Sequence, residues 1–139
     1  MMWKEKYRVG VGLIDSQHIE LFSRLSNFIQ IVQNENDWDE KLDEVKETMA
    51  FMQEYVVFHF DDEEKYMEQI DYPHIELHKK IHKDFKDSIN DYVNLLQEGG
   101  FTEDKIQELG AKLMTWLIMH VGKMDQQIGE YVKEKGGQA

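Results

Sequence analysis

The stretch from Trp38 to Gln69, WDEKLDEVKETMAFMQEYVVFHFDDEEKYMEQ, decides the fold of this chain. Its inward-facing positions recur in alternating steps of three and four residues, which is the spacing of one face of an α-helix. These positions are Leu42, Val45, Met49, Met52, Val56, His59, Glu63 and Tyr66. The pattern predicts a helix over residues 38–69 and places a histidine and a carboxylate on its buried face.

Three further segments show the same helical spacing. They span residues 15–34, 73–98 and 103–134. Asp15 is expected to cap the first helix, and Pro73, the only proline, fits the first turn of the third. The pairs Gly99-Gly100 and Gly136-Gly137 are expected to end the last two helices. Because short connections make neighbouring helices antiparallel, we predict an all-α, up-down-up-down four-helix bundle with an extended N-terminal arm, in one domain over residues 1–139.

Composition narrows the classes of function. The chain has 28 acidic and 16 basic residues, and the net charge of -12 argues against binding to nucleic acid or to anionic membranes. It has no cysteine, so any metal must be held by nitrogen and oxygen ligands. The first residues lack the apolar run of a signal peptide, and no stretch has the length of a membrane span. We therefore expect a cytoplasmic location.

Polar residues interrupt the apolar faces of all four helices at one depth of the bundle. Measured from the end where helices one and two connect, they lie roughly 24 to 36 Å along their helices. The residues are His18, His59, Glu63, His74, His78, His120 and Asp125. His82 lies a full turn deeper on its helix, beside the better-aligned Ile81, so we expect it to be a flanking or surface residue.

This convergence predicts a metal site. Buried carboxylates cost several kcal/mol each unless they are paired, and a bound cation removes that penalty. Five histidines with two carboxylates are too many ligands for one tetrahedral ion. They suit two octahedral ions that share both carboxylates and an oxygen bridge, with one coordination position left open. Imidazole with carboxylate favours iron, although zinc and manganese stay possible on ligand type.

His120 and Asp125 are five residues apart, about 140° around an ideal α-helix, so both cannot face one point on a regular helix. We predict a local π-type bulge near Gly122, because such bulges occur at functional sites.

Four motifs, IDSQHIELF, HFDDEEKYM, YPHIELHKKIH and WLIMHVGKMD, resemble in order and spacing those of the hemerythrin family, most closely its single-domain bacterial members. The resemblance runs from about Val11 to beyond Met124. One departure follows Asp125, where Gln126 and Ile128 replace the lysine and tyrosine common in bacterial relatives. This departure puts hydrogen bonding around that end of the site in doubt.

The resemblance implies a di-iron centre with an oxo or hydroxo bridge. It makes His74, His78 and His120 ligands of one iron and His18 and His59 ligands of the other, with Glu63 and Asp125 bridging. Dioxygen would bind reversibly at the second iron, for storage, delivery or buffering. The family's apolar pocket would consist of Leu21, Phe60, Trp116, Leu117 and Val121, for which ordinary core packing is the alternative.

Other functions stay open. A di-iron enzyme could reduce oxygen, peroxide or nitric oxide with an external electron donor, or show weak oxidase or peroxidase activity. Five neutral imidazoles favour the ferrous state more than the carboxylate-rich sites of ferritin-like oxidases do, which argues for a carrier. An oxygen-sensing or iron-handling module would need a separate partner protein. We expect a monomer.

Overall fold

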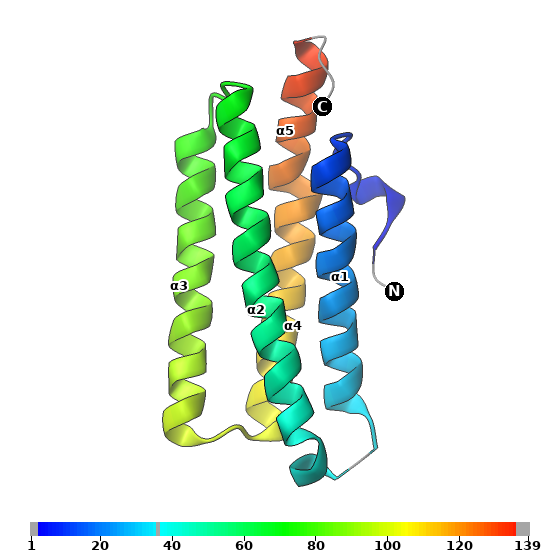
Figure 1. Ribbon diagram of the computed structural model, residues 1–139, viewed down its shortest axis with the longest axis vertical. Coiled ribbons are helices and arrows are strands. Elements are labelled where there is room, and N and C mark those ends of the chain that lie inside the picture. The colour runs from blue at the N-terminus through cyan, green and yellow to red at the C-terminus, as the bar shows by residue number, and fades with distance from the viewer. Residues whose placement is uncertain (1–2, 36, 136–139) are drawn as a thin grey trace.

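The computed structural model describes residues 3–35 and 37–135. Four long helical stretches form the bundle: α1 (Gly12–Gln33), α2 (Trp38–Gln69), α3 (Ile75–Gly99), and a last stretch made of α4 (Glu103–Met119), the π-helical η2 (His120–Met124) and α5 (Asp125–Glu134). Figure 1 shows that successive stretches run in opposite directions. The all-α bundle is therefore confirmed. The expected Gly136-Gly137 stop lies outside the described residues.

Helix bounds follow the predicted ranges closely, except that α3 begins at Ile75, so Pro73 lies before the helix and not in its first turn as predicted. The α2 bounds agree with the prediction, and Thr102 is the N-cap residue of α4. The α1 helix begins at Gly12, so the predicted N-cap role of Asp15 is wrong. The buried Asp15 carboxylate instead accepts hydrogen bonds from the backbone N–H groups of Val9, at 2.6 Å, and Gly10, at 3.0 Å. Asp15 therefore fastens the N-terminal arm to the bundle.

The N-terminal arm packs along the bundle and contains a short 3-10 turn, η1 (Glu5–Tyr7). Tyr7 is buried and stacks on Phe22 of α1, with ring centroids 5.3 Å apart. The arm also passes so close to α5 that a side-chain carbon at Gly129 would overlap the carbonyl oxygen of Val9. A glycine at position 129 is thus a condition for the arm's path.

The two ends of the bundle are apolar, and the polar residues lie between them. One buried cluster fills the end near the α1–α2 connection and includes Phe28, Val45 and Leu109. The other, at the opposite end, includes Ile14, Met67 and Ile128. Among the described residues, no helix is apolar enough over a sufficient length to cross a membrane. The fold thus delivers polar side chains to a region closed by hydrocarbon on both sides.

Candidate metal centre

Seven side chains from all four helical stretches meet in the interior. They are His18 from α1, His59 and Glu63 from α2, His78 and His82 from α3, His120 at the start of η2, and Asp125 at the start of α5. Each is at most 4% exposed. The spacing of four residues places the two α2 side chains, and likewise the two α3 histidines, on one helix face.

Three histidines surround one side of the carboxylate pair. The Nε2 atom of His78 lies 2.9 Å from both Glu63 Oε1 and Asp125 Oδ1. His82 Nε2 lies 3.3 Å from the same oxygen of Glu63, and His120 Nε2 lies 3.2 Å from the same oxygen of Asp125. The Nε2 atoms of His82 and His120 are 3.1 Å apart. These five side chains form one group of potential ligands for a metal ion.

Two histidines face the other oxygen of each carboxylate. His18 Nε2 lies 2.9 Å from Asp125 Oδ2, and His59 Nε2 lies 3.2 Å from Glu63 Oε2. With the two carboxylates they form a second group of potential ligands. Because each carboxylate turns one oxygen to each group, Glu63 and Asp125 have the geometry of bridges between two metal positions.

The structure corrects the sequence-based choice of histidines on α3. His74 is exposed at the N-cap of α3, with φ -103° and ψ 22°, and belongs to neither group. His82, expected at the surface, has 0% exposure and lies within the first group. The error arose because α3 begins only at Ile75, so His74 lies beyond the level at which the other side chains meet. The other six predicted residues are brought together.

Outer hydrogen bonds fix two of the rings. His59 Nδ1 lies 2.8 Å from Gln17 Oε1, and the amide of Gln17 donates in turn to Asp62. His82 Nδ1 lies 2.8 Å from Glu64 Oε2. Since a carbonyl or carboxylate oxygen only accepts, Nδ1 carries the proton in both rings and Nε2 keeps its lone pair toward the centre. Sequence analysis missed these partners, although Gln17 and Glu64 directly precede or follow a site residue.

The charge balance of the centre also favours a cation. Burial disfavours the ionised form of Glu63, but neighbouring imidazoles, His59 foremost, hold its pKa well below the usual value. The pKa of Asp125 is lowered too, against burial and the charge of Glu63, by His120 and His18. Both carboxylates are therefore ionised at neutral pH inside the protein, and two buried negative charges require positive compensation.

The imidazoles respond to those two carboxylates. Burial by itself would lower the pKa of His18, but hydrogen bonds and the charges of Asp125 and Glu63 raise it to about 9. The pKa values of His78 and His120 also rise to about 9 against the effect of burial. Protons and a metal cation satisfy the same electrostatic demand, and they compete for the same Nε2 lone pairs.

Unpaired atoms show that the donor set fits metal ions. Within the described residues, several buried atoms of the centre make no hydrogen bond of acceptable geometry. These are Nε2 of His18, Nε2 of His59, Oε2 of Glu63 and both carboxylate oxygens of Asp125. The Nε2 atom of His18 lies 2.9 Å from Asp125 Oδ2, and that of His59 lies 3.2 Å from Glu63 Oε2. The lone pairs of these atoms converge at hydrogen-bonding distance without forming hydrogen bonds. Five imidazoles with two bridging carboxylates match a pair of first-row transition ions better than hard, all-oxygen cations.

The π-type bulge expected near Gly122 is confirmed as η2. The widened turn takes up one extra residue, so that His120 and Asp125 both face the centre. Gln126 supports it: its side-chain amide donates to the carbonyl oxygens of Tyr7, at 2.8 Å, and Val121, at 3.2 Å. The departure at position 126 therefore supplies hydrogen bonds that join η2 to the arm, while the Ile128 departure extends the apolar cluster.

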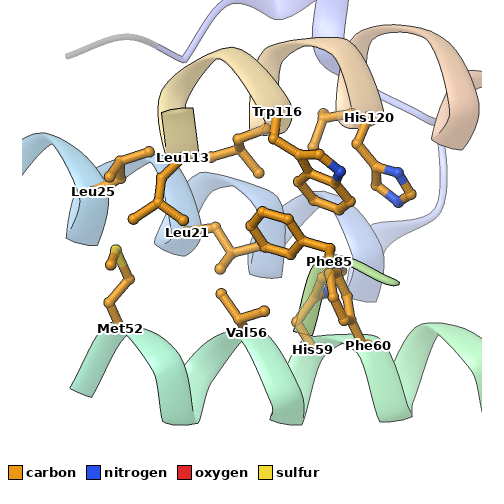
Figure 2. Close-up of a pocket in the computed structure, with 12 residues that line it drawn as sticks. Leu21, Leu25, Met52, Val56, His59, Phe60, Phe85, Leu113, Trp116 and His120 are labelled. Atoms are coloured by element: carbon orange, nitrogen blue, oxygen red, sulfur yellow. The ribbon is translucent and has the colours of Figure 1, made fainter. Parts of the chain in front are cut away.

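An apolar pocket of about 30 Å³ adjoins the centre (Figure 2). All five residues expected from the sequence line it: Leu21, Phe60, Trp116, Leu117 and Val121. His59 and His120 bound the pocket, which brings it against both metal positions. Sequence analysis missed five further apolar lining residues: Leu25, Met52, Val56, Phe85 and Leu113. The cavity exceeds the volume that one water-sized molecule needs, about 10–15 Å³, so it accommodates a diatomic ligand.

Two aromatic stacks hold ligand rings against this pocket. Phe60 lies parallel to His82, with centroids 3.8 Å apart and planes 1° apart. Trp116 stacks on His120, with centroids 4.3 Å apart and planes 12° apart. These contacts restrict ring rotation and keep the pocket wall next to the metal positions dry.

Comparison with known proteins agrees with this geometry. A family model described as Hemerythrin HHE cation binding domain matches residues 9–132. A protein named bacteriohemerythrin from Clostridium acetobutylicum is 29% identical over 127 residues, which cover 91% of this chain and 96% of that protein. The bacteriohemerythrin of Stenotrophomonas maltophilia is 29% identical over 133 residues, covering 96% and 82%. That of Campylobacter jejuni is 28% identical over 136 residues, covering 97% and 98%.

Proposed function

Since the chain belongs to the hemerythrin family, we propose that its buried centre holds two iron ions joined by an oxo or hydroxo bridge and binds dioxygen reversibly. The protein would store, deliver or buffer oxygen rather than catalyse an obligatory turnover. We also propose that the protein is a monomer and that it is located in the cytoplasm. Names of the relatives and the family description support iron as the metal, because this family is built around a non-heme iron centre.

The division of histidines around the two carboxylates carries the proposal. His78, His82 and His120 face one oxygen of each carboxylate, and His18 and His59 face the other. With two bridging carboxylates, the metal position beside His18 and His59 has one fewer protein ligand. That position is therefore the one with room for an external ligand, and His59 also borders the apolar pocket.

A di-iron centre supplies the electrons for reversible dioxygen binding when it is loaded. The chain's own residues supply the environment. Glu63 and Asp125 hold two cations close together, and the hydrogen bond to Gln17 keeps Nε2 of His59 directed inward. Phe60, Leu117 and the other apolar lining residues exclude water and anions from the pocket, which retards loss of a partly reduced ligand and irreversible oxidation.

One observation favours the competing function, a di-iron reductase of oxygen, peroxide or nitric oxide. Trp116 is partly exposed, and its ring stacks directly on His120. An aromatic ring that joins a ligand to the surface offers an electron donor a place to dock. The reductase would need such a donor, a reduced flavin or a small redox protein, whereas the carrier would not.

The deciding experiment measures metal content and visible absorbance while the purified protein is cycled between air and argon. Two irons per chain with a reversible colour change would support the carrier. Steady oxygen consumption with a reductant would support the reductase, and a single zinc in a colourless protein would contradict both. His59→Ala should abolish oxygen binding, because the open metal position has only two histidines to lose; normal cycling of this variant would contradict the assignment.

A further inference from the structure

A second cavity, of about 80 Å³, lies beside the first, between α2 and α3. Four residues line both cavities: Met52, Val56, Phe85 and Leu113. The wall between the cavities is therefore one layer of side chains. In Figure 2, Met52 and Leu113 stand at the end of the inner pocket opposite His59, whereas Val56 and Phe85 lie nearer to it, so the second cavity runs along one side of the pocket.

The second cavity reaches the surface of the α2–α3 seam. Val57 on α2 and Asn90 on α3, which line it, are both exposed. Gln53 and Lys86 lie at the same mouth and are partly exposed. A small molecule at this mouth thus meets a polar rim first and an apolar interior behind it, which admits an uncharged apolar molecule more readily than an ion.

Other cavities offer poorer connections. The groove between α1 and α4, which contains Ala111, shares no lining residue with the inner pocket. A depression on the face of α4, which contains Met119, shares only Trp116. The Trp116 ring is held between Phe85, with centroids 3.7 Å apart, and His120, with centroids 4.3 Å apart. Such a clamped ring closes that side of the pocket.

The contact between α2 and α3 is also the helix contact that opens most easily. Within the described residues, α3 has only three buried side chains, His78, His82 and Leu96, whereas α1 has nine. Two of the three belong to the metal centre. The stretch of α3 that lines the second cavity, residues 85–90, has no fully buried side chain, so small displacements there expose little apolar surface. Met52, on the opposite wall, has an unbranched and adaptable side chain.

We propose that the cavity between α2 and α3 is a transit site for small uncharged ligands, and that Met52, Val56, Phe85 and Leu113 form the gate to the inner pocket. That the ligand in transit is dioxygen rests on the proposed function. That the cavity takes up a small apolar molecule does not depend on the proposed function.

Blocking the seam from either wall tests the transit site. Val57→Trp and Asn90→Trp place an indole at the mouth from exposed positions, outside the inner pocket. Dioxygen association and release should both slow by roughly tenfold with unchanged affinity, because an obstructed route alters both rates equally. The matched controls Ala111→Trp and Met119→Trp, in the two other cavities, should leave both rates unchanged. Unchanged rates in both blocking variants, or slowing by Met119→Trp instead, would overturn the proposal.

Xenon separates failure of the transit site from failure of the proposed function, because it is an apolar probe that needs no iron chemistry. Ile89 lines the second cavity and not the inner pocket, so xenon in the second cavity should shift the methyl resonances of Ile89, and both blocking variants should diminish that shift. Met67, which is fully buried in the other apolar cluster, is the internal reference and should not respond. An Ile89 response in a protein that binds no dioxygen would support the cavity while contradicting the function. A silent Ile89 would overturn the transit site.

Discussion

Replacing His82 by alanine removes one of three imidazoles from the first group of metal ligands. Its Nε2 lies 3.3 Å from Glu63 and 3.1 Å from Nε2 of His120, and its Nδ1 lies 2.8 Å from Glu64. Four-ligand structural zinc sites bind their ion with about 10–16 kcal/mol, or about 3 kcal/mol per ligand. Loss of one imidazole should therefore weaken the ion at this position on the order of a hundredfold.

The assay is metal content per chain by elemental analysis, after dialysis against a weak chelator. We expect the His82→Ala protein to lose one of its two ions first, and His74→Ala, at an exposed position, to keep both. Since alanine at position 82 leaves a void beside Phe60, the His82→Ala protein should also lose about 2–4 kcal/mol of stability. His82→Leu keeps most of the volume and should show the same metal loss in a more stable protein.

Retention of both ions by His82→Ala and His82→Leu, together with metal loss in His74→Ala, would refute the reasoning. It would mean that α3 presents a different face to the centre when metal is bound. Loss of metal in all three variants would show that metal loss follows from general destabilisation, because His74 touches neither ligand group.

Three further substitutions, one of them with a matched control, test the surroundings of the centre. Gly129→Ala would push against the carbonyl of Val9 and should lower the free energy of unfolding by about 1–3 kcal/mol. Gly122→Ala is the control, because its methyl group would make only ordinary contacts, and it should lower the free energy of unfolding less. Thermal denaturation compares the two variants. Gln126→Ala removes two hydrogen bonds from η2 and should lower stability by about 2 kcal/mol, measured by urea denaturation; no change would mean that Gln126 does not support the bulge. Glu64→Ala frees the His82 ring and should weaken metal binding by roughly 10–100-fold in a chelator competition, and an unchanged affinity would exclude an orienting role.

The fold was predictable because apolar periodicity fixes which helix face is buried. For α2, eight regularly spaced positions predicted its length, and five of them are buried: Val45, Met49, Met52, His59 and Glu63. Lys41, Phe60 and Met67, which lie beside this series, are buried as well. The start of α1 was not predictable in this way. An aspartate before an apolar run has the pattern of an N-cap, and only the path of the arm shows that Asp15 binds Val9 and Gly10 instead.

The α3 histidines show where spacing stops being informative. His74, His78 and His82 form two overlapping four-residue steps, and both steps place their histidines on one helix face equally well. The choice depends on where α3 begins, which is set by a turn in which Asp71 has φ 52°. One signal was available: His82 lies 16 residues before Glu98, as far from the bundle end as His18 is before Asn34.

Partners outside the ligand set could not be predicted. Gln17 and Glu64 each adjoin a ligand in the chain, but neighbouring residues on a helix point in different directions. Whether such a residue reaches an imidazole depends on how the helices are rotated against one another, and on side-chain rotamers. By contrast, the bulge in the last helix was predictable, since a five-residue interval between two converging ligands has no solution on a regular helix.

The π-helical segment also sets which residues of α5 face the core. If the helix were a regular α-helix throughout, the face that is buried in residues 103–119 would continue into α5, but each buried position there would lie one residue earlier in the sequence. The extra residue in His120–Met124 shifts the phase by about 100°, and this brings Ile128, Gly129 and Val132 inward. A single deletion within this segment would therefore do more than misplace Asp125: it would turn the buried face of α5 toward solvent. Sequence length between residues 120 and 124 is thus constrained by the packing of the C-terminal turns as strictly as by the metal ligands themselves.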